Sequence, residues 1–283
     1  MQRNYIRNLF LTTVLSVLCF PSSVFAQHTD SLLVVQTPWN SKTIQKGIVW
    51  HQAHFSNLFN SVQEINWVEI DLKKNRGKVH LAADSTRLKT TSTFALENNA
   101  VVAINGGFFD MKNGGSVDYI KVNNQIINHT KSPSRRANAV LSIHKRKISI
   151  QQSNLHNTEE SNAANILLSG PLLIEKDSII RLRDDPFNSN RHPRTAIALT
   201  KKNKLILLVV DGRNKMAQGM NLEELAKVLK WIGAKDAMNL DGGGSSTLYI
   251  QGMTANNIVN YPTDNKKFDH DGQRKVANII YIN

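Results

Sequence analysis

Three apolar stretches of this 283-residue chain end in the same way, with a short polar side chain followed by glycine. They are INGG at residues 104–107, VDGR at residues 210–213 and LDGGGSS at residues 240–246. Apolar runs of this kind are typical of strands buried on both faces, so the polar side chain that ends each run lies at the rim of a sheet. The pattern therefore predicts a sheet-based fold whose rim presents Asn and Asp side chains.

Further strands are indicated along most of the chain. Apolar and acidic residues alternate over residues 67–72, and a second apolar run follows at residues 79–82, which predicts two strands joined by a turn. Residues 118–127 have the pattern of a hairpin that turns at Asn123 and Asn124. We therefore expect an α+β fold with a large mixed or antiparallel sheet, few helices and a single compact domain.

The clearest helix is expected to begin at Asn221, where Glu224 stands at the capping-box position, and to end at Gly233. The segment before the first strong strand is polar and interrupted by aromatic residues, so residues 27–65 are interpreted as an N-terminal extension packed on the domain. Residues 66–283 are expected to form the domain itself.

The first 26 residues have the pattern of a signal peptide. Arg3 and Arg7 give a basic start, residues 9–20 are mostly apolar, and small residues precede a cleavage point after Ala26. An uncleaved anchor is disfavoured because the apolar stretch is shorter than a membrane span. Lipidation at Cys19 is disfavoured because a leucine precedes it. We therefore expect a protein exported to the periplasm or the medium, with no stable membrane span after cleavage.

The cysteine count excludes some kinds of site in the mature chain, and the net charge indicates the kind of partner. Cys19 is the only cysteine, so cleavage removes any disulfide, thiol nucleophile or cysteine-bound zinc. The formal net charge of +13 falls to +11 without Arg3 and Arg7. An excess of that size favours anionic partners such as phosphate-bearing glycans, and nucleic acid is not expected for an exported protein.

The glycine-rich strand ends are the first candidate site. Backbone N–H groups turned toward a ligand suit a phosphate or a developing oxyanion, and an adjacent carboxylate can move a proton, attack carbon or hold a cation. A single Asp-Gly pair is more often an ordinary turn with a side-chain cap. The triple glycine after Asp241 is harder to explain as a turn, because each glycine costs backbone entropy on folding.

A second candidate cluster is Arg191-His192-Pro193-Arg194-Thr195. Pro193 fixes its own φ and restricts His192 to extended conformations, which holds the neighbouring side chains at a defined separation. The guanidinium of Arg194 suits a bidentate grip on phosphate. The alternative is a surface histidine beside an arginine in a structural ion pair.

These motifs taken together resemble the phosphodiester glycosidase family, over about residues 64–281. The resemblance rests on TTSTFALENNAVVAINGGFF at residues 90–109, SGP at 169–171, HPRTA at 192–196, VDGR at 210–213, residues 219–233, NLDGGGSST at 239–247 and GQRKVAN at 272–278. It implies hydrolysis of the bond between a sugar's anomeric carbon and a phosphodiester oxygen. A bacterial envelope or scavenging role on a glycan or sugar phosphodiester is then expected.

The resemblance and the residue chemistry lead to these expected roles. Arg194 and Arg213 hold the phosphate, Asp241 or Asp211 is the base or nucleophile, and His192 protonates or orients. The groups that position the substrate are expected to be Asn105, Gly106, Thr195, Gly243, Gly244 and Ser245. No cofactor is expected to be required, although a Ca²⁺ or Mg²⁺ ion stays open.

Two other functions are compatible with the same residues. One is a metal-dependent phosphodiesterase that cleaves P–O, with Asp211, Asp241 and either Asp110 or Glu69 as ligands of Mg²⁺ or Ca²⁺. The other is a non-catalytic envelope protein that binds glycan phosphates. The sequence assigns neither the sugar nor an oligomeric state.

Overall fold

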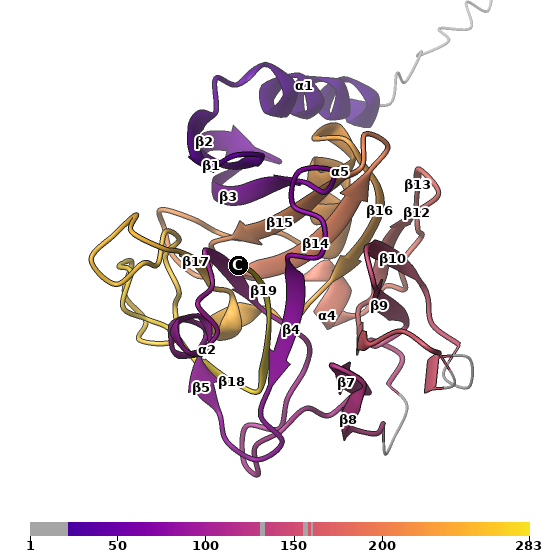
Figure 1. The fold of residues 1–283 in the computed structure, drawn as a ribbon. Coiled ribbons are helices and arrows are strands. Elements are labelled where there is room, and N and C mark those ends of the chain that lie inside the picture. Colours follow the sequence, from indigo (N-terminus) through magenta and orange to yellow (C-terminus); the bar gives the residue numbers. More distant parts are fainter. Residues whose placement is uncertain (1–21, 131–133, 155–157, 160) are drawn as a thin grey trace, which may run out of the picture.

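A computed structural model of the chain describes residues 22–130, 134–154, 158–159 and 161–283. Most of the predicted signal peptide, including residues 9–20 and Cys19, lies outside these residues. Helix α1 (Ser22–Gln36) runs across the predicted cleavage point after Ala26 and lies beside helix α5 (Leu222–Trp231) (Figure 1).

The largest sheet has eight strands in the order β1-β2-β3-β15-β14-β16-β12-β13, and every neighbouring pair is antiparallel. The predicted large sheet is thereby confirmed in its antiparallel form. Its strands are β1 (Asn40–Gln45), β2 (Ile48–Leu58), β3 (Ser61–Asp71), β12 (Leu172–Glu175), β13 (Ser178–Ile179), β14 (Arg194–Thr200), β15 (Lys204–Val210) and β16 (Ala234–Asn239).

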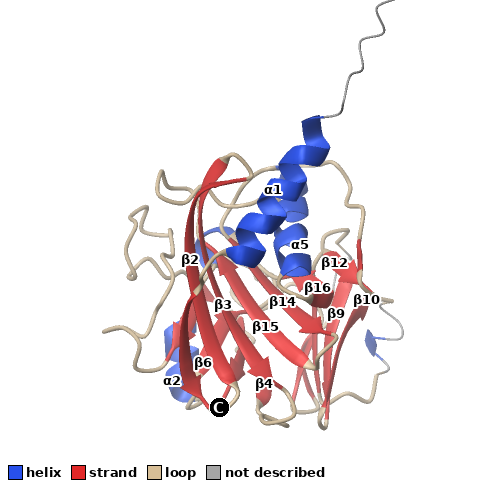
Figure 2. Cartoon of the chain, turned by 90° about the horizontal axis from the view of Figure 1, so that it is seen from above, coloured by secondary structure: helices blue, strands red, loops and turns tan. Residues whose placement is uncertain are grey.

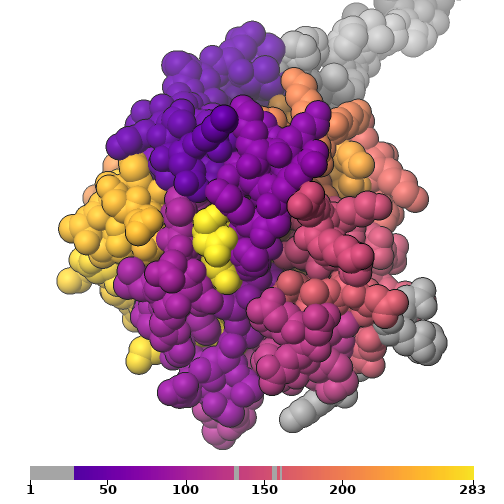
Figure 3. Space-filling model, in the orientation of Figure 1, coloured from indigo at the N-terminus to yellow at the C-terminus, as the bar shows by residue number. Residues whose placement is uncertain are grey.

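Three smaller antiparallel sheets pack around the large one. A five-stranded sheet contains β7 (Ile120–Val122), β8 (Gln125–Asn128), β9 (Ala139–His144), β10 (Lys147–Gln152) and β11 (Asn165–Ser169). A four-stranded sheet contains β4 (Val79–Ala83), β6 (Val102–Asn105), β17 (Leu248–Ile250) and β19 (Asn278–Ile282). The last pairs β5 (Lys89–Thr90) with β18 (Lys275–Val276). Figure 3 shows the end of the chain, in yellow, between segments of the first half, because β19 is inserted between β6 and β4.

Few helices accompany these strands in the described residues. The shorter ones are α2 (Thr91–Glu97), α4 (Pro186–Ser189) and the 3-10 turn η1 (Gly243–Ser245). Helix α5 has the predicted capping box: the Asn221 side chain accepts from the Glu224 backbone N–H at 2.8 Å, and the Glu224 carboxylate accepts from the Asn221 N–H at 3.0 Å. The predicted hairpin turn is also confirmed, because Asn123 and Asn124 both have positive φ, at 49° and 66°.

The core has two main parts, one on each face of the large sheet. Helices α1 and α5 cover one face (Figure 2), where Val34 and Leu225 pack with Leu208 of β15. On the other face, Val68 of β3 packs in a cluster with Leu141 of the five-stranded sheet and side chains of the four-stranded one. Burial of these apolar side chains is the dominant stabilising contribution to the fold.

The predicted boundary between an extension and the domain differs from the structure. Strand β3 runs across residues 65 and 66, and β3 pairs with β15 from Asp71–Lys204 to Ile65–Val210. Strands β1 and β2 continue the same sheet. Most of residues 27–65 are therefore an edge of the sheet and not an extension packed on it. The sequence signal was weak because β2 has one exposed face, so its residues are not a continuous apolar run.

Candidate functional site

The predicted strand ends meet at one end of the large sheet. In the antiparallel register, Arg194 at the start of β14 lies opposite Val210 at the end of β15. Ala196 lies opposite Asn239 at the end of β16. The segments that precede β14, follow β15 and follow β16 therefore leave the sheet side by side.

Asn105, at the end of β6, joins the four-stranded sheet to this rim. Its side-chain N–H donates to the Asp241 carbonyl at 2.7 Å, and its side-chain oxygen accepts from the Thr195 hydroxyl at 2.8 Å and the Thr247 N–H at 3.1 Å. The Asp241 N–H donates to the Gly106 carbonyl at 2.9 Å. The sequence predicted that Asn105 and Thr195 position the substrate. Both side chains are fully buried, so they hold the rim together and do not reach a substrate directly.

Asp241 is the half-buried carboxylate of the rim. Burial raises its pKa to about 6, although the Ser245 hydroxyl, the Gly242 N–H and the charges of Arg274 and Arg213 oppose that rise. A carboxyl group with this pKa exchanges its proton close to neutral pH. That property is typical of a general base or a nucleophile in an active site.

The glycines after Asp241 allow two guanidinium groups to lie against the backbone. Gly243 has a φ of +63°, and a Cβ there would come within 2.9 Å of Arg213 Nη2. A Cβ on Gly244 would come within 2.6 Å of Arg274 Nη2. The Gly243 N–H donates to the Pro193 carbonyl at 2.8 Å, so the turn is anchored to the segment before β14. The triple glycine is therefore required for close approach as well as for turning.

Asp211 differs from Asp241 because it is only 1% exposed. Its Oδ1 accepts from the Asn260 side chain at 2.8 Å and from the Tyr261 N–H at 3.0 Å, whereas Oδ2 has no partner among the described residues. Burial raises its pKa to about 7, and the charge of Glu64 adds to the rise. Of the two predicted aspartates, Asp241 is thus the one that a substrate can reach.

Arg194 does not have the free guanidinium that a bidentate phosphate grip needs. It is 2% exposed, its Nε donates to the Met220 carbonyl and its Nη2 donates to the carbonyls of Phe187 and Asn190, each at 2.8 Å. Burial lowers its pKa to about 10, with a further contribution from the nearby charge of Arg213. Arg194 therefore fixes the loop before β14, and Arg213 is the exposed arginine of the predicted pair.

His192 lies next to both arginines and is half-buried. Burial lowers its pKa first, and the charges of Arg194 and Arg213 lower it further. Its Nδ1 has no partner among the described residues, while its backbone exchanges two hydrogen bonds with Met220. The imidazole is therefore neutral at pH 7, in the form that accepts a proton or orients a neighbouring group.

Comparison with known proteins identifies the family of the chain. Residues 98–283 match the family described as phosphodiester glycosidase. The chain belongs to this family. It is 27% identical over 204 residues to N-acetylglucosamine-1-phosphodiester alpha-N-acetylglucosaminidase of Bos taurus, covering 64% of this chain but only 36% of the bovine protein. It is 35% identical over 68 residues to the uncharacterized protein YomE from the SPbeta prophage of Bacillus subtilis, covering 24% of this chain and 11% of that protein.

Solved structures support the fold. The catalytic domain of the zebrafish N-acetylglucosamine-1-phosphodiester alpha-N-acetylglucosaminidase, auto-inhibited by its pro-peptide, aligns with a TM-score of 0.69 at 20% identity, covering 85% of each chain. A hypothetical protein from Synechocystis aligns with a TM-score of 0.64 at 16% identity, covering 87% of this chain and 64% of that one. The α+β fold with its mainly antiparallel sheets is thus the fold of the phosphodiester glycosidase family.

Two residues of the site, Arg274 and Asn278, were given no role by the sequence analysis. Arg274 pairs with Asp264, with Nη2 to Oδ1 at 2.6 Å. The Asn278 side chain accepts from the Gly107 N–H at 2.7 Å, and its carbonyl accepts from the Gly106 N–H at 3.0 Å. Gly106 is therefore a backbone anchor for β19. The closing GQRKVAN motif contained both residues, but no pattern in it indicates that β19 returns to the rim.

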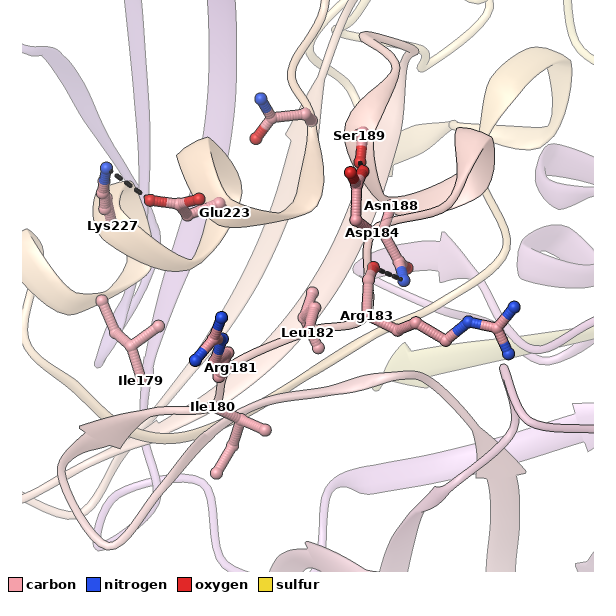
Figure 4. A pocket seen from close by; sticks show the side chains of 11 residues that line it. Ile179, Ile180, Arg181, Leu182, Arg183, Asp184, Asn188, Ser189, Glu223 and Lys227 are labelled. Carbon is pink, nitrogen blue, oxygen red and sulfur yellow. Dashed lines mark hydrogen bonds and ion pairs between the residues drawn. The ribbon is translucent and has the colours of Figure 1, made fainter.

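A cavity of about 280 Å³ opens beside the rim. It is lined by Arg213, Asn214, Thr263, Asp264, Lys266, Lys267 and Arg274. A larger cavity of about 540 Å³ lies between the segment after β13 and the start of α5 (Figure 4), and none of the predicted site residues lines it. The smaller cavity is therefore the one that belongs to the candidate site.

The ligands expected for a metal-dependent phosphodiesterase are not brought together. Asp110 caps its own turn through the N–H groups of two following residues. Glu69 on β3 pairs with Lys204 and lies opposite Ile206, near the start of β15. Asp211 follows Val210, at the other end of β15. Within the described ranges, no three His, Cys, Asp or Glu side chains are grouped to hold a metal ion. No helix in the described part of the chain is long and apolar enough to span a bilayer.

Proposed function

We propose that this chain is an exported hydrolase that cleaves a glycosyl phosphodiester between the anomeric carbon and the phosphate oxygen, releasing a sugar and a phosphomonoester. The observation that carries the proposal is the half-buried carboxylate of Asp241, set beside Arg213 and Arg274 on a glycine turn. Membership of the phosphodiester glycosidase family supports it, as do relatives named for that reaction on N-acetylglucosamine. The chain spans about a third of the length of those relatives.

The reaction follows from the charges at the rim. Asp241 either takes a proton from a water molecule that attacks the anomeric carbon, or attacks that carbon itself to form a glycosyl ester that water then hydrolyses. In both routes the bond from the anomeric carbon to the phosphate oxygen breaks, and its electron pair stays on that oxygen. The leaving phosphate gains negative charge as the bond breaks. Arg213 and Arg274 stabilise that charge in the transition state, because their guanidinium groups already lie at the rim.

His192 has a supporting role. Its imidazole is neutral at pH 7 and lies near Arg213, so it can orient the leaving group through a hydrogen bond without adding a further positive charge. The buried Asn105 and Arg194 keep the rim in place and are positioning residues. No metal ion takes part in this scheme.

The position of bond cleavage is tested in ¹⁸O-labelled water with a synthetic N-acetylglucosamine 1-phosphodiester. Attack at the anomeric carbon places the label in the sugar hydroxyl, and mass spectrometry of both products reads it. Label in the phosphate would instead show P–O cleavage, as in the alternative phosphodiesterase. Running the same assay with a chelator separates the two chemistries again, because the proposed reaction keeps its rate.

The predicted export is tested by isolating the protein that expressing cells release. A mature chain that starts at Gln27 is expected, since the predicted cleavage follows Ala26. Intact-mass measurement of the released protein reads this directly. A chain that keeps residues 1–26 and stays with the membrane fraction would contradict the expected processing.

A further inference from the structure

The cavity beside the rim is unusually rich in positive charge. Two arginines and two lysines line it, against the single carboxylate of Asp264. Asp264 is already engaged by Arg274, which it meets at 2.6 Å from Nη2 and 2.7 Å from Nε. In the described part of the chain, no ion pair engages Arg213, Lys266 or Lys267. The charges of the lining side chains therefore sum to three positive units, and the nearest further carboxylates are Asp269, beside Lys267, and Asp241, beside Arg213.

The two arginines are enough to balance the charge of one scissile phosphate, so the two lysines are additional cations. Arg213 and Arg274 lie against Gly243 and Gly244 in the turn after Asp241, and both interact with the Asp241 carboxylate, so in the proposed reaction they are the cations beside the scissile bond. The two lysines come from a different segment, which follows β17 among the orange and yellow loops of Figure 1. Lys266 and Lys267 line a part of the cavity that is not formed by the rim residues.

The lysine-bearing loop has a defined shape. Lys266 has a φ of 61°, and its N–H donates to the Thr263 carbonyl at 3.1 Å. The Lys267 N–H donates to the Asn265 side chain at 3.0 Å, and Asn265 donates in turn to Asp269 at 2.8 Å. The two ammonium groups are thus presented by a closed turn, which holds like charges together on one wall of the cavity. Because both lysines are exposed, water screens their mutual repulsion, and the pair attracts an anion that enters the cavity.

We propose that this cavity is a second anion subsite, which binds a further phosphate on the alcohol side of the scissile phosphodiester. The preferred substrates are then glycosyl phosphodiesters whose released alcohol carries another phosphate, as in a phosphate-bearing glycan chain. This subsite rests on the proposed function for its place in the reaction, but its binding of anions does not depend on turnover.

The test compares two substrates that differ only in the alcohol: N-acetylglucosamine 1-phosphate esterified to glycerol, and the same compound with a phosphate on the far glycerol hydroxyl. In the variant Lys266→Asn/Lys267→Gln, asparagine is chosen because it tolerates positive φ. The control Lys73→Gln/Lys202→Gln removes the same charge from exposed lysines at the opposite end of the large sheet.

For the wild type, KM for the phosphorylated substrate is expected to be about 5- to 10-fold lower than KM for the plain glycerol ester. This ratio corresponds to the binding free energy of two partly exposed ion pairs. The loop variant loses this preference with kcat unchanged, and the control keeps it. Raising the salt concentration weakens the preference in the wild type. Equal KM values in wild type and loop variant would overturn the subsite while leaving the proposed function intact.

Calorimetric binding of glycerol 1,3-bisphosphate and of glycerol 1-phosphate separates the two proposals. Tighter binding of the bisphosphate that is lost only in the loop variant supports the subsite even if neither ester is hydrolysed, an outcome that would refute the proposed function alone. Identical affinities for the two compounds in all three proteins would refute the subsite.

Discussion

Asp241 is the residue whose replacement tests the chemistry most directly. Asp241→Asn keeps the size of the side chain but removes the group that moves a proton or attacks carbon, so kcat on a glycosyl phosphodiester is expected to fall by about 10²- to 10⁴-fold. The wild-type rate is also expected to fall below a pH of about 6, where Asp241 becomes protonated. Steady-state kinetics from pH 4 to 9, with melting curves to verify folding, measure both effects. A variant with the wild-type rate and pH profile would exclude Asp241 from the mechanism.

Asp211 is expected to influence stability through pH. Its folded-state pKa of about 7 lies above the ordinary value of 3.8, so the folded protein binds the proton more tightly than the unfolded chain does. The stability that this group contributes is complete below pH 3.8 and is lost as pH rises through 7. Asp211→Asn keeps the acceptor for Asn260 and Tyr261 without the buried charge.

The melting temperature of Asp211→Asn is therefore expected to exceed that of the wild type at pH 8, by about 2–4 °C for each kcal/mol gained. At pH 5 the melting temperatures of the two proteins are expected to differ by no more than about 2–4 °C. Scanning calorimetry at both pH values measures the difference. A variant that is less stable than the wild type at pH 8 would show that the charged form is favoured in the fold.

At the scale of the elements, Asn105 is the connection between the four-stranded sheet and the rim of the large one. Asn105→Ala leaves the Thr195 hydroxyl, the Thr247 N–H and the Asp241 carbonyl without this partner in a buried site. Each loss costs about 1–3 kcal/mol, so unfolding in urea is expected to be easier by about 3 kcal/mol or more. The exposed Asn162→Ala is the matched control and is expected to change stability by less than about 0.5 kcal/mol. Equal stability of the two variants would contradict the role of Asn105 as a junction.

The glycine turn after β16 is tested by two alanine variants with the same backbone strain. Gly243 and Gly252 both have positive φ, at 63° and 75°, so alanine costs about 1–2 kcal/mol at either site. Only the alanine at 243 also meets a neighbour, because its Cβ would displace the Arg213 guanidinium, whereas nothing lies within 4 Å at 252. Gly243→Ala is therefore expected to lose about 10-fold or more in kcat/KM. Gly252→Ala is expected to keep its activity, and an equal loss in both would attribute the effect to strain alone.

At the scale of the whole molecule, local patterns predicted the elements better than the contacts between them. The capping box at Asn221 and the hairpin turn at Asn123 depend on residues a few positions apart, and both were predicted. The resemblance supplied the family. The roles of Arg194 and Asn105 were not predictable, because their partners at Met220 and Asp241 come from distant segments. An arginine that binds phosphate and an arginine that donates to backbone carbonyl groups can occur in the same local sequence, so the motif alone does not distinguish them.

The domain boundary is a consequence of the same long-range pairing, and it can be tested by truncation. A fragment of residues 66–283 lacks β1, β2 and the first half of β3, which uncovers the edge of the remaining part of β3 and removes Phe55, Leu58 and Ile65 from the core on that face. It is expected to aggregate or to unfold without a cooperative transition, because an apolar strand edge is exposed. A fragment of residues 27–283 keeps the complete sheet and is expected to melt cooperatively and to retain activity. Size-exclusion chromatography and melting curves compare the two, and a monomeric 66–283 fragment with the melting temperature of the longer one would re-establish residues 27–65 as a separate extension.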